Sequence, residues 1–289
     1  MNGDLFVSEE MVSRGEFVLD KMETRLAQDN LVHYELVSGD RRVALSDCLG
    51  KSVEINFSGR ILCCYCGQAT NKSFGQGYCY KHFMALAQCD ACMMSPEKCH
   101  IAQGTCREPE WAENVCLQPH YVYLANASDL KVGITRAGQL PTRWIDQGAV
   151  QATPIARVSS RYLSGLVEVT FKQKVADKTN WRAMLKGDNA SIDLHARRDE
   201  LFAELKPQLD ELILQHGRQH IQLIHHSEVQ EIRYPVQRYP EKISSFNLDK
   251  QPLVAGILQG IKGQYLIFDT GVMNVRRHTG YQIELRIQA

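Results

Sequence analysis

Long apolar runs are missing from this sequence of 289 residues. No stretch approaches the roughly 18 consecutive apolar residues that a membrane-spanning helix needs, which excludes insertion into a bilayer. The N-terminus also lacks a basic start followed by an apolar run, so we expect no signal peptide. We therefore expect a cytoplasmic protein in which thiols stay reduced and disulfide bonds are disfavoured.

The chain also has no net charge at neutral pH, because its 33 basic residues balance its 33 acidic residues. The charges are distributed unevenly along the chain. Residues 117–186 contain ten Lys and Arg against four Asp and Glu, and residues 232–289 contain eight against four. Basic blocks in a neutral chain are compatible with phosphate binding, so we predict a nucleic-acid partner, DNA or RNA. The alternative is that each block is a solvated face.

Soft metal ligands are concentrated between residues 63 and 106. The first set has the pattern C-x2-C-x12-C-x2-H, at which two short knuckles deliver four ligands to tetrahedral Zn²⁺: Cys63, Cys66, Cys79 and His82. The second set has the pattern C-x2-C-x6-C-x6-C: Cys89, Cys92, Cys99 and Cys106. We predict two structural zinc ions, with an iron–sulfur cluster as the alternative at the second set. Three neighbouring residues could replace a ligand of the second set: His100, Cys116 and His120.

Residues 117–186 have the pattern of a small α/β domain. Tyr121-Val122-Tyr123 and Lys131-Val132-Gly133 lie on the strands of a predicted hairpin, and residues 141–147 are predicted to form a helix that ends at Gly148. Residues 162–174 are interpreted as a second helix, with a strand as the alternative. The order and spacing of these motifs resemble the GIY-YIG nuclease superfamily, with a lysine at the second motif as in one of its branches. The resemblance implies six site residues: Tyr121, Tyr123, Lys131, Arg143, Glu168 and Asn180.

This resemblance implies hydrolysis of a phosphodiester. Tyr123, or alternatively Tyr121, would take a proton from an attacking water, and Glu168 would hold one Mg²⁺. Arg143 would stabilise the negative charge of the transition state. Because Lys131 replaces a tyrosine of many superfamily members, two alternatives stay open. The protein could bind DNA or RNA without cutting it, or it could be a zinc-stabilised adaptor for protein partners.

The predicted fold class is α+β with several modules, since the length exceeds that of one typical domain. Four segments are expected: a β-rich N-terminal segment (1–62), a zinc-binding module (63–116), the GIY-YIG-like domain with a helical extension (117–231), and a small β-barrel-like C-terminal domain (232–289). In the C-terminal domain, six side chains suit contact with a nucleic-acid backbone and stacking of bases: Lys262, Arg276, Arg277, His278, Tyr265 and Tyr281.

The whole chain is also similar to a bacterial family known mainly as a domain of unknown function. Three runs of residues carry this similarity: Gly104-Thr105-Cys106-Arg107-Glu108-Pro109, Arg143-Trp144-Ile145-Asp146-Gln147-Gly148-Ala149 and Gly260-Ile261-Lys262-Gly263-Gln264-Tyr265. The similarity implies that the four segments belong together, and no established activity comes with it.

Overall fold

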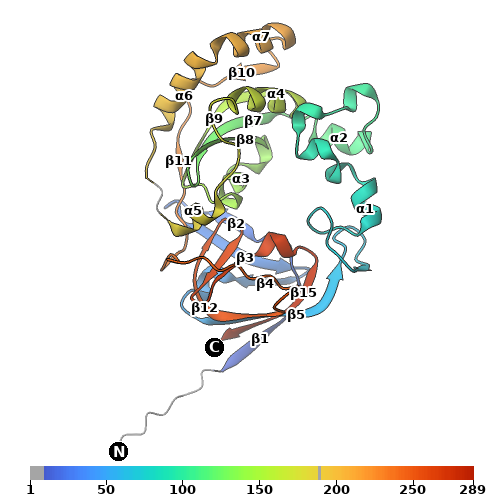
Figure 1. Cartoon of the computed structure of the whole chain (residues 1–289), viewed down its shortest axis with the longest axis vertical. Helices are drawn as coiled ribbons and strands as arrows, with labels where there is room; N and C mark the ends of the chain where they lie inside the picture. Colours follow the sequence, from blue (N-terminus) through green and yellow to red (C-terminus); the bar gives the residue numbers. More distant parts are fainter. Residues whose placement is uncertain (1–9, 188–189) are drawn as a thin grey trace, which may run out of the picture. The chain divides into compact units, whose positions relative to one another are not determined.

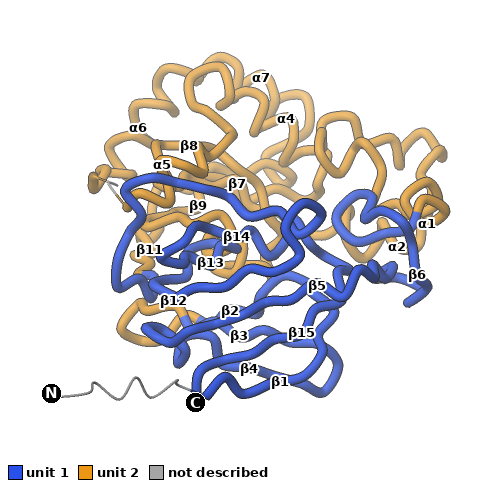
Figure 2. Tube along the Cα trace, turned by 60° about the horizontal axis from the view of Figure 1, so that its bottom comes forward, with its two compact units in different colours: residues 1–25, 33–79, 234–289 blue, residues 26–32, 80–233 orange. Residues whose placement is uncertain are grey.

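The structure, a computed structural model, describes residues 10–187 and 190–289. The chain divides into two compact units (Figure 2). Within the described residues, unit 1 contains 10–25, 33–79 and 234–289, and unit 2 contains 26–32, 80–187 and 190–233. Helices and strands are both abundant, which confirms the predicted α+β class. Every helix in the described part of the chain is too short or too polar to traverse a lipid bilayer.

Unit 1 is built around a seven-stranded antiparallel sheet with the order β1-β15-β5-β12-β13-β14, in which β6 also pairs with β5 (Figure 1). Its strands are β1 (Met11–Val18), β5 (Ser52–Leu62), β6 (Ala69–Thr70), β12 (Leu253–Lys262), β13 (Tyr265–Phe268), β14 (Val272–Asn274) and β15 (Tyr281–Gln288). A second sheet contains β2 (Glu23–Leu26), β3 (Val32–Ser38) and β4 (Arg41–Ala44). Two 3-10 helices, η1 (Leu45–Cys48) and η7 (Val275–His278), complete the unit.

Alternation of apolar and polar residues places the core of unit 1 on one face of its large sheet. In β15 the residues Tyr281, Ile283, Leu285 and Ile287 are all buried, while the residues between them are more exposed. Successive side chains of a strand point to opposite faces, so this period of two buries one face. At the β3–β4 hairpin, Gly39 has a φ of 59°, a conformation that glycine adopts without a steric penalty. The turn Ser38-Gly39-Asp40 between two strand-like runs, residues 31–37 and 42–45, predicts this hairpin, and the pairing of β3 with β4 confirms it.

The predicted C-terminal barrel is wrong, because none of the sheets in the described residues closes into a barrel. The strands of residues 232–289 instead join strands from residues 1–62. β15 lies between β1 and β5, and β12 pairs with the other edge of β5. Glycine-rich turns indicate where strands end, but they carry no information about pairing between opposite ends of the chain.

Unit 2 has a sheet with the order β10-β9-β7-β8, and β11 also pairs with β9. Its strands are β7 (His120–Asn126), β8 (Leu130–Arg136), β9 (Gln151–Val158), β10 (Ile221–Leu223) and β11 (Gln230–Glu231). The helices that follow β8 are η6 (Ala137–Gln139), α3 (Thr142–Asp146), α4 (Arg161–Phe171), α5 (Trp181–Lys186), α6 (Leu194–Glu204) and α7 (Lys206–His216). The predicted helices of residues 141–147 and 162–174 correspond to α3 and α4 and are confirmed.

One hydrophobic core joins the unit 2 sheet to three helices. Val122, Leu124 and Val132 of the sheet pack in one cluster with Val167 and Phe171 of α4, and apolar side chains of α6 and α7 belong to the same cluster. After α4 the chain returns along the edge strand β8, where the Val132 N–H donates to the Ala176 carbonyl at 2.9 Å. This return brings the residues that follow Ala176 next to the side chain of Lys131.

The cysteine-rich segment is composed of short helical turns. They are α1 (Tyr80–Ala85), η2 (Ala87–Cys89), η3 (Ala91–Met93), η4 (Pro96–Lys98), η5 (Ile101–Gln103) and α2 (Pro109–Val115). The turn η4 packs closely against α4 at Gly165, where an added Cβ would lie 2.3 Å from the Glu97 backbone nitrogen. Only glycine fits at this position, so α4 and the cysteine-rich segment form one packed structure within unit 2.

Candidate functional site

The first metal-ligand set lies in the segment that leaves β5. Cys63 directly follows that strand, and the chain turns back at Gly67, whose φ is 69° and whose N–H donates to the Cys63 carbonyl at 2.7 Å. Cys79 precedes α1, and His82 lies in that helix. One ligand atom from each residue of the set lies within 4.8 Å of the other three: Cys63, Cys66, Cys79 and His82.

This arrangement could bind a metal ion such as zinc. Zinc–sulfur and zinc–nitrogen bonds are about 2.3 and 2.0 Å long, so ligand atoms within 4.8 Å of one another need shifts of only about 1 Å or less to share one ion. Three thiols and one imidazole are also the ligand types of a closed structural zinc site. The sequence spacing and the three-dimensional arrangement therefore indicate the same four ligands.

A polar cluster in unit 2 contains four of the six residues implied by the nuclease resemblance. Tyr123 comes from β7, Lys131 from β8, Arg143 from α3 and Glu168 from α4. The Tyr123 hydroxyl donates to Oε1 of Gln147 at 2.8 Å, and Lys131 Nζ donates to the same oxygen. The charges of Arg143 and Glu168 act on both Tyr123 and Lys131. Three of its side chains are buried, since Tyr123, Lys131 and Glu168 are 0 %, 3 % and 7 % exposed, whereas Arg143 is half-buried.

Burial dominates the electrostatics of this cluster. It raises the pKa of Tyr123, and the positive charge of Arg143 opposes that rise. It lowers the pKa of Lys131 to about 7, and Arg143 acts in the same direction. Burial also raises the pKa of Glu168, while the ammonium of Lys172 opposes the shift. Such strongly perturbed groups gather at functional sites more often than elsewhere.

Glu168 is already paired with a cation. Lys172, one helical turn later, places Nζ 3.2 Å from Glu168 Oε2 and 3.1 Å from Asp177 Oδ2. One ammonium thus bridges two carboxylates at the end of α4. Any metal ion that uses the Glu168 carboxylate must first displace Lys172.

The other two implied residues have different surroundings. Asn180 is the N-cap of α5, and its side-chain oxygen accepts from the Ala183 N–H at 3.2 Å. Its neighbour Thr179 is the residue that contacts Lys131, at 2.8 Å. Tyr121 is half-buried in β7, opposite Thr135 and Arg157 in the sheet, and no described contact ties its side chain to the polar cluster. The structure therefore brings Tyr123 and Thr179 into the cluster, whereas the sequence-predicted Tyr121 and Asn180 have other surroundings.

Gln147 holds the cluster together, although the sequence motifs assign it no role. It follows α3 and accepts hydrogen bonds from both Tyr123 and Lys131. Its position in the sequence could have indicated this role, because Gln147 lies four residues after Arg143 and residues at this spacing share one face of a helix.

Replacing Gly133 with alanine is expected to destabilise unit 2 by about 1–3 kcal/mol through overpacking. A Cβ at Gly133 would lie 2.6 Å from the Tyr123 hydroxyl, whose ring is held by Gln147 and by an edge contact with Trp144. Urea unfolding measures the loss. Gly138→Ala is the matched control, because nothing lies within 4 Å of its added Cβ. Equal unfolding midpoints for the two variants would contradict the expectation.

Lys131 is expected to make stability depend on pH. Between its folded pKa of about 7 and the ordinary value of 10.5, unfolded Lys131 binds a proton that folded Lys131 lacks, so stability rises with pH in this window. Relative to a Lys131→Met variant, the wild type should gain on the order of 1 kcal/mol per pH unit between about pH 7.5 and about pH 9. Denaturant unfolding of the wild type and of Lys131→Met at both pH values measures this gain. If the free energies of unfolding of the two proteins changed equally with pH, the expectation would be refuted.

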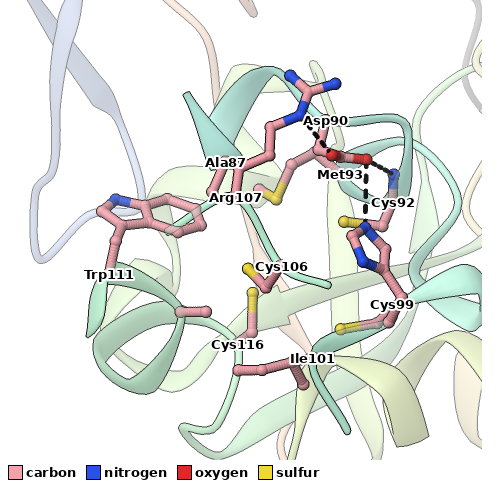
Figure 3. A pocket seen from close by; sticks show the side chains of 12 residues that line it. Ala87, Asp90, Cys92, Met93, Cys99, Ile101, Cys106, Arg107, Trp111 and Cys116 are labelled. Carbon is pink, nitrogen blue, oxygen red and sulfur yellow. Dashed lines mark hydrogen bonds and ion pairs between the residues drawn. The ribbon is translucent and has the colours of Figure 1, made fainter. Parts of the chain in front are cut away.

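The second cysteine set is rearranged relative to the prediction. A cavity in unit 2 is lined by Cys92, Cys99 and Cys106 together with Cys116, and Cys89 is not among its lining residues (Figure 3). Burial raises the pKa of Cys92 to about 11, and the neighbouring charges of Asp90, Cys99 and Cys116 act in the same direction. His120, a suggested replacement ligand, is fully buried in β7 and does not line the cavity.

A second group of ligand types in this region contains Asp90, Cys92 and His100, whose ligand atoms lie within 4.8 Å of one another. Its oxygen and nitrogen atoms already have partners. Asp90 pairs with Arg107 at 2.7 Å and faces His100 Nε2 at 3.6 Å, and His100 Nδ1 contacts the Thr105 hydroxyl at 2.8 Å. The thiols are therefore the better candidates for metal ligands here.

The predicted nucleic-acid contacts of residues 232–289 are partly wrong. Lys262 is 1 % exposed, and its Nζ lies 5.5 Å from the ring centres of Tyr234 and Tyr239. His278 is also buried, and the buried Tyr281 donates its hydroxyl to Asp249 at 2.8 Å. These side chains build the interior of unit 1 and cannot contact a phosphate backbone or stack on bases.

Comparison with known proteins identifies a family. A protein-family model described as a protein of unknown function (DUF2797) matches residues 50–283. No curated protein and no solved structure matches the chain. The family match covers the strands from β5 to the start of β15, both cysteine sets and the polar cluster. Because it spans well over half of the sequence, the chain belongs to the DUF2797 family.

Proposed function

We propose that this protein binds nucleic acid and hydrolyses phosphodiester bonds with Mg²⁺ at the polar cluster of unit 2, while zinc at the first metal-ligand set stabilises its fold. The observation that carries the proposal is the convergence of Tyr123, Arg143 and Glu168 from three different elements. A phenol, a guanidinium and a carboxylate can serve as base, charge stabiliser and metal ligand in phosphoryl transfer. The same residues follow one another in the order that the GIY-YIG resemblance implies.

Each side chain has a distinct role in the proposed reaction. Tyr123 first releases its own proton to solvent, and its phenolate then accepts a proton from the attacking water. Gln147 orients the Tyr123 ring through the 2.8 Å hydrogen bond that the phenol donates. Arg143 favours the phenolate form and stabilises the charge that develops on the phosphate, a contact that contributes roughly 3 to 4 kcal/mol in a preorganised site. Lys131, with a pKa of about 7, can donate or accept a proton at neutral pH.

The carboxylates of Glu168 and Asp177 would hold the Mg²⁺. Lys172 supports this assignment, because its ammonium lies within 3.2 Å of both carboxylates and occupies a place that favours a cation. Carboxylate oxygens are the protein ligands that Mg²⁺ prefers. When bound there, the ion would supply positive charge to the scissile phosphate and the leaving oxygen.

Binding without cleavage is the second candidate, and the burial of the cluster favours it. The reactive atoms of Tyr123 and Lys131 are enclosed, and Lys172 covers the Glu168 carboxylate. A nuclease of this kind needs a rearrangement that opens the cluster to substrate. Under this alternative the excess positive charge of residues 117–186 contacts the phosphate backbone, and the polar cluster only stabilises the fold.

Arg143→Met is expected to lower the cleavage rate about 10² to 10³-fold, because it removes one preorganised charge from the transition state. The assay uses the full chain with labelled DNA and RNA in Mg²⁺. Arg197→Met is the matched control, since Arg197 lies on the exposed surface of α6 and pairs with Glu200. It should cleave at the wild-type rate.

Two outcomes separate the candidates. Wild-type cleavage that Arg143→Met abolishes or strongly reduces supports the nuclease. Saturable, salt-sensitive binding of the same DNA or RNA with no cleavage by the wild type rejects catalysis and supports the binding protein. Neither binding nor cleavage would reject both.

A further inference from the structure

We infer that Cys92, Cys99, Cys106 and Cys116 bind a single zinc ion in unit 2, and that this ion fastens the cysteine-rich segment to the start of α4. The site differs from the sequence-predicted second zinc site in one ligand, because Cys116 takes the place of Cys89. The inference does not rest on the proposed nuclease activity, since metal content and the protection of a helix are measured without nucleic acid.

The fold assigns the four ligands. All four thiols line one small cavity, with Cys106 and Cys116 on one side and Cys92 and Cys99 on the other (Figure 3). Short helical elements position three of them: Cys92 lies in η3, Cys99 follows η4, and Cys116 follows α2. Cys89 does not line the cavity. Four cysteine thiolates are one of the ligand sets of structural zinc sites.

The size of the cavity matches one ion. Its volume is about 10 Å³, which is room for about one water-sized sphere. Zinc with four bonds of about 2.3 Å holds its sulfurs about 3.8 Å apart. Among the described residues these four thiols do not reach the mutual spacing of 4.8 Å seen in the first metal-ligand set, so binding draws them inward. The turns η3 and η5 bury no residue, so this contraction disturbs little packing.

The four thiols also act on one another electrostatically. Burial raises the pKa of the Cys116 thiol, and Cys99 and Cys106 act in the same direction. The positive charge of Arg161 opposes the rise at both Cys92 and Cys116. Thiolates this close repel one another, and a divalent cation between them replaces that repulsion with attraction. Metal binding therefore accounts for four thiols around one small space.

The cavity lies against the start of α4. The Arg161 N–H at the beginning of this helix donates to the Cys116 carbonyl at 2.7 Å, and the Arg161 guanidinium donates to the Met93 carbonyl at 2.6 Å. One turn later, Gly165 packs on the backbone of η4, which lies between the first two cavity cysteines in the chain. An ion that joins the thiols therefore also fixes α4, the helix that carries Glu168.

Zinc analysis of the full chain tests the inference. The purified protein is dialysed against a weak chelator, which removes loosely bound ions. We expect about two zinc ions per chain, one at the first metal-ligand set and one at the cavity. Only about one zinc ion per chain, or a different metal in place of the second zinc, would overturn the inference.

Paired variants test the ligand assignment. Cys106→Ser and Cys116→Ser should each keep about one zinc ion per chain, whereas Cys89→Ser and His100→Gln should keep about two. The two controls remove the sequence-predicted ligand and the imidazole of the neighbouring group that contains Asp90. Loss of the second zinc in either control, or its retention in both cavity variants, would contradict the assignment. The wild-type zinc content decides on the ion even if a variant does not fold.

Hydrogen exchange tests the link to α4. Among the described residues no hydrogen bond joins Cys106 to this helix, so an effect of Cys106→Ser on α4 acts through the ion. Exchange of the amides of residues 161–168 should be at least tenfold faster in Cys106→Ser than in the wild type, and unchanged in Cys89→Ser. Equal protection of these amides in Cys106→Ser and the wild type would show that the ion does not fasten α4.

Discussion

Replacing Cys79 with serine is expected to abolish zinc binding at the first metal-ligand set and to unfold the segment between β5 and α1. This segment contains only the two-residue strand β6, an isolated bridge between Phe74 and Tyr78, and turns, so it has little hydrophobic core of its own. Zinc contributes on the order of 10 kcal/mol to the folding of small zinc modules at neutral pH. Its loss should therefore remove the order of the whole segment rather than weaken one contact.

Cys64→Ser is the matched control for this prediction. Cys64 adjoins the set in sequence but is exposed and contributes no ligand atom to it. Elemental analysis should give about one zinc at this set in the wild type and in Cys64→Ser, and none there in Cys79→Ser. Hydrogen exchange should show loss of protection in residues 63–82 of Cys79→Ser only. Unchanged zinc content and protection in Cys79→Ser would rule out the proposed ligand set.

Glu168→Gln is expected to reduce DNA or RNA cleavage to the background level. The amide keeps the shape of the side chain but removes the charge that the proposed Mg²⁺ needs. Stability should change far less, because the Lys172 ammonium retains its second partner, Asp177, at 3.1 Å. Cleavage rates and denaturant unfolding measured on the same preparations separate a catalytic loss from a folding defect.

Glu204→Gln provides the same chemical change at a surface position. Glu204 is about half exposed and pairs with Lys174 at 3.0 Å on the surface of unit 2. An exposed pair of this kind contributes about 0–1 kcal/mol, so the variant should keep both cleavage and stability. Equal cleavage by Glu168→Gln and wild type would reject the mechanism and leave nucleic-acid binding as the remaining proposal.

Features set by local sequence were predicted correctly. The β3–β4 hairpin follows from a glycine turn between two strand-like runs, and α3 begins after Pro141 and ends before Gly148. The first metal-ligand set also depends on short spacings. Each of these features involves residues near one another in the chain, where backbone geometry limits the possible arrangements.

The candidate catalytic cluster was predicted in part. Order along the chain indicated Tyr123, Lys131, Arg143 and Glu168, and these residues do come together. The burial of Tyr123, Lys131 and Glu168 was not foreseen, because it depends on how α3, α4 and the return along β8 cover the strands. The pairing of Lys172 with both Glu168 and Asp177 was missed for the same reason.

The sequence alone determined the α+β class, the positions of the local hairpins and helices, and the four residues of the first metal-ligand set, which could bind a metal ion. These depend on periodicity, turn residues and spacings of a few residues, all of which act within one stretch of chain. Tertiary structure alone decided that β15 joins β1 to β5, that Lys262 is buried between tyrosines, and that Cys116 rather than Cys89 faces the cavity. Those outcomes depend on the packing of distant segments, which is governed by the total burial of apolar surface rather than by any local pattern.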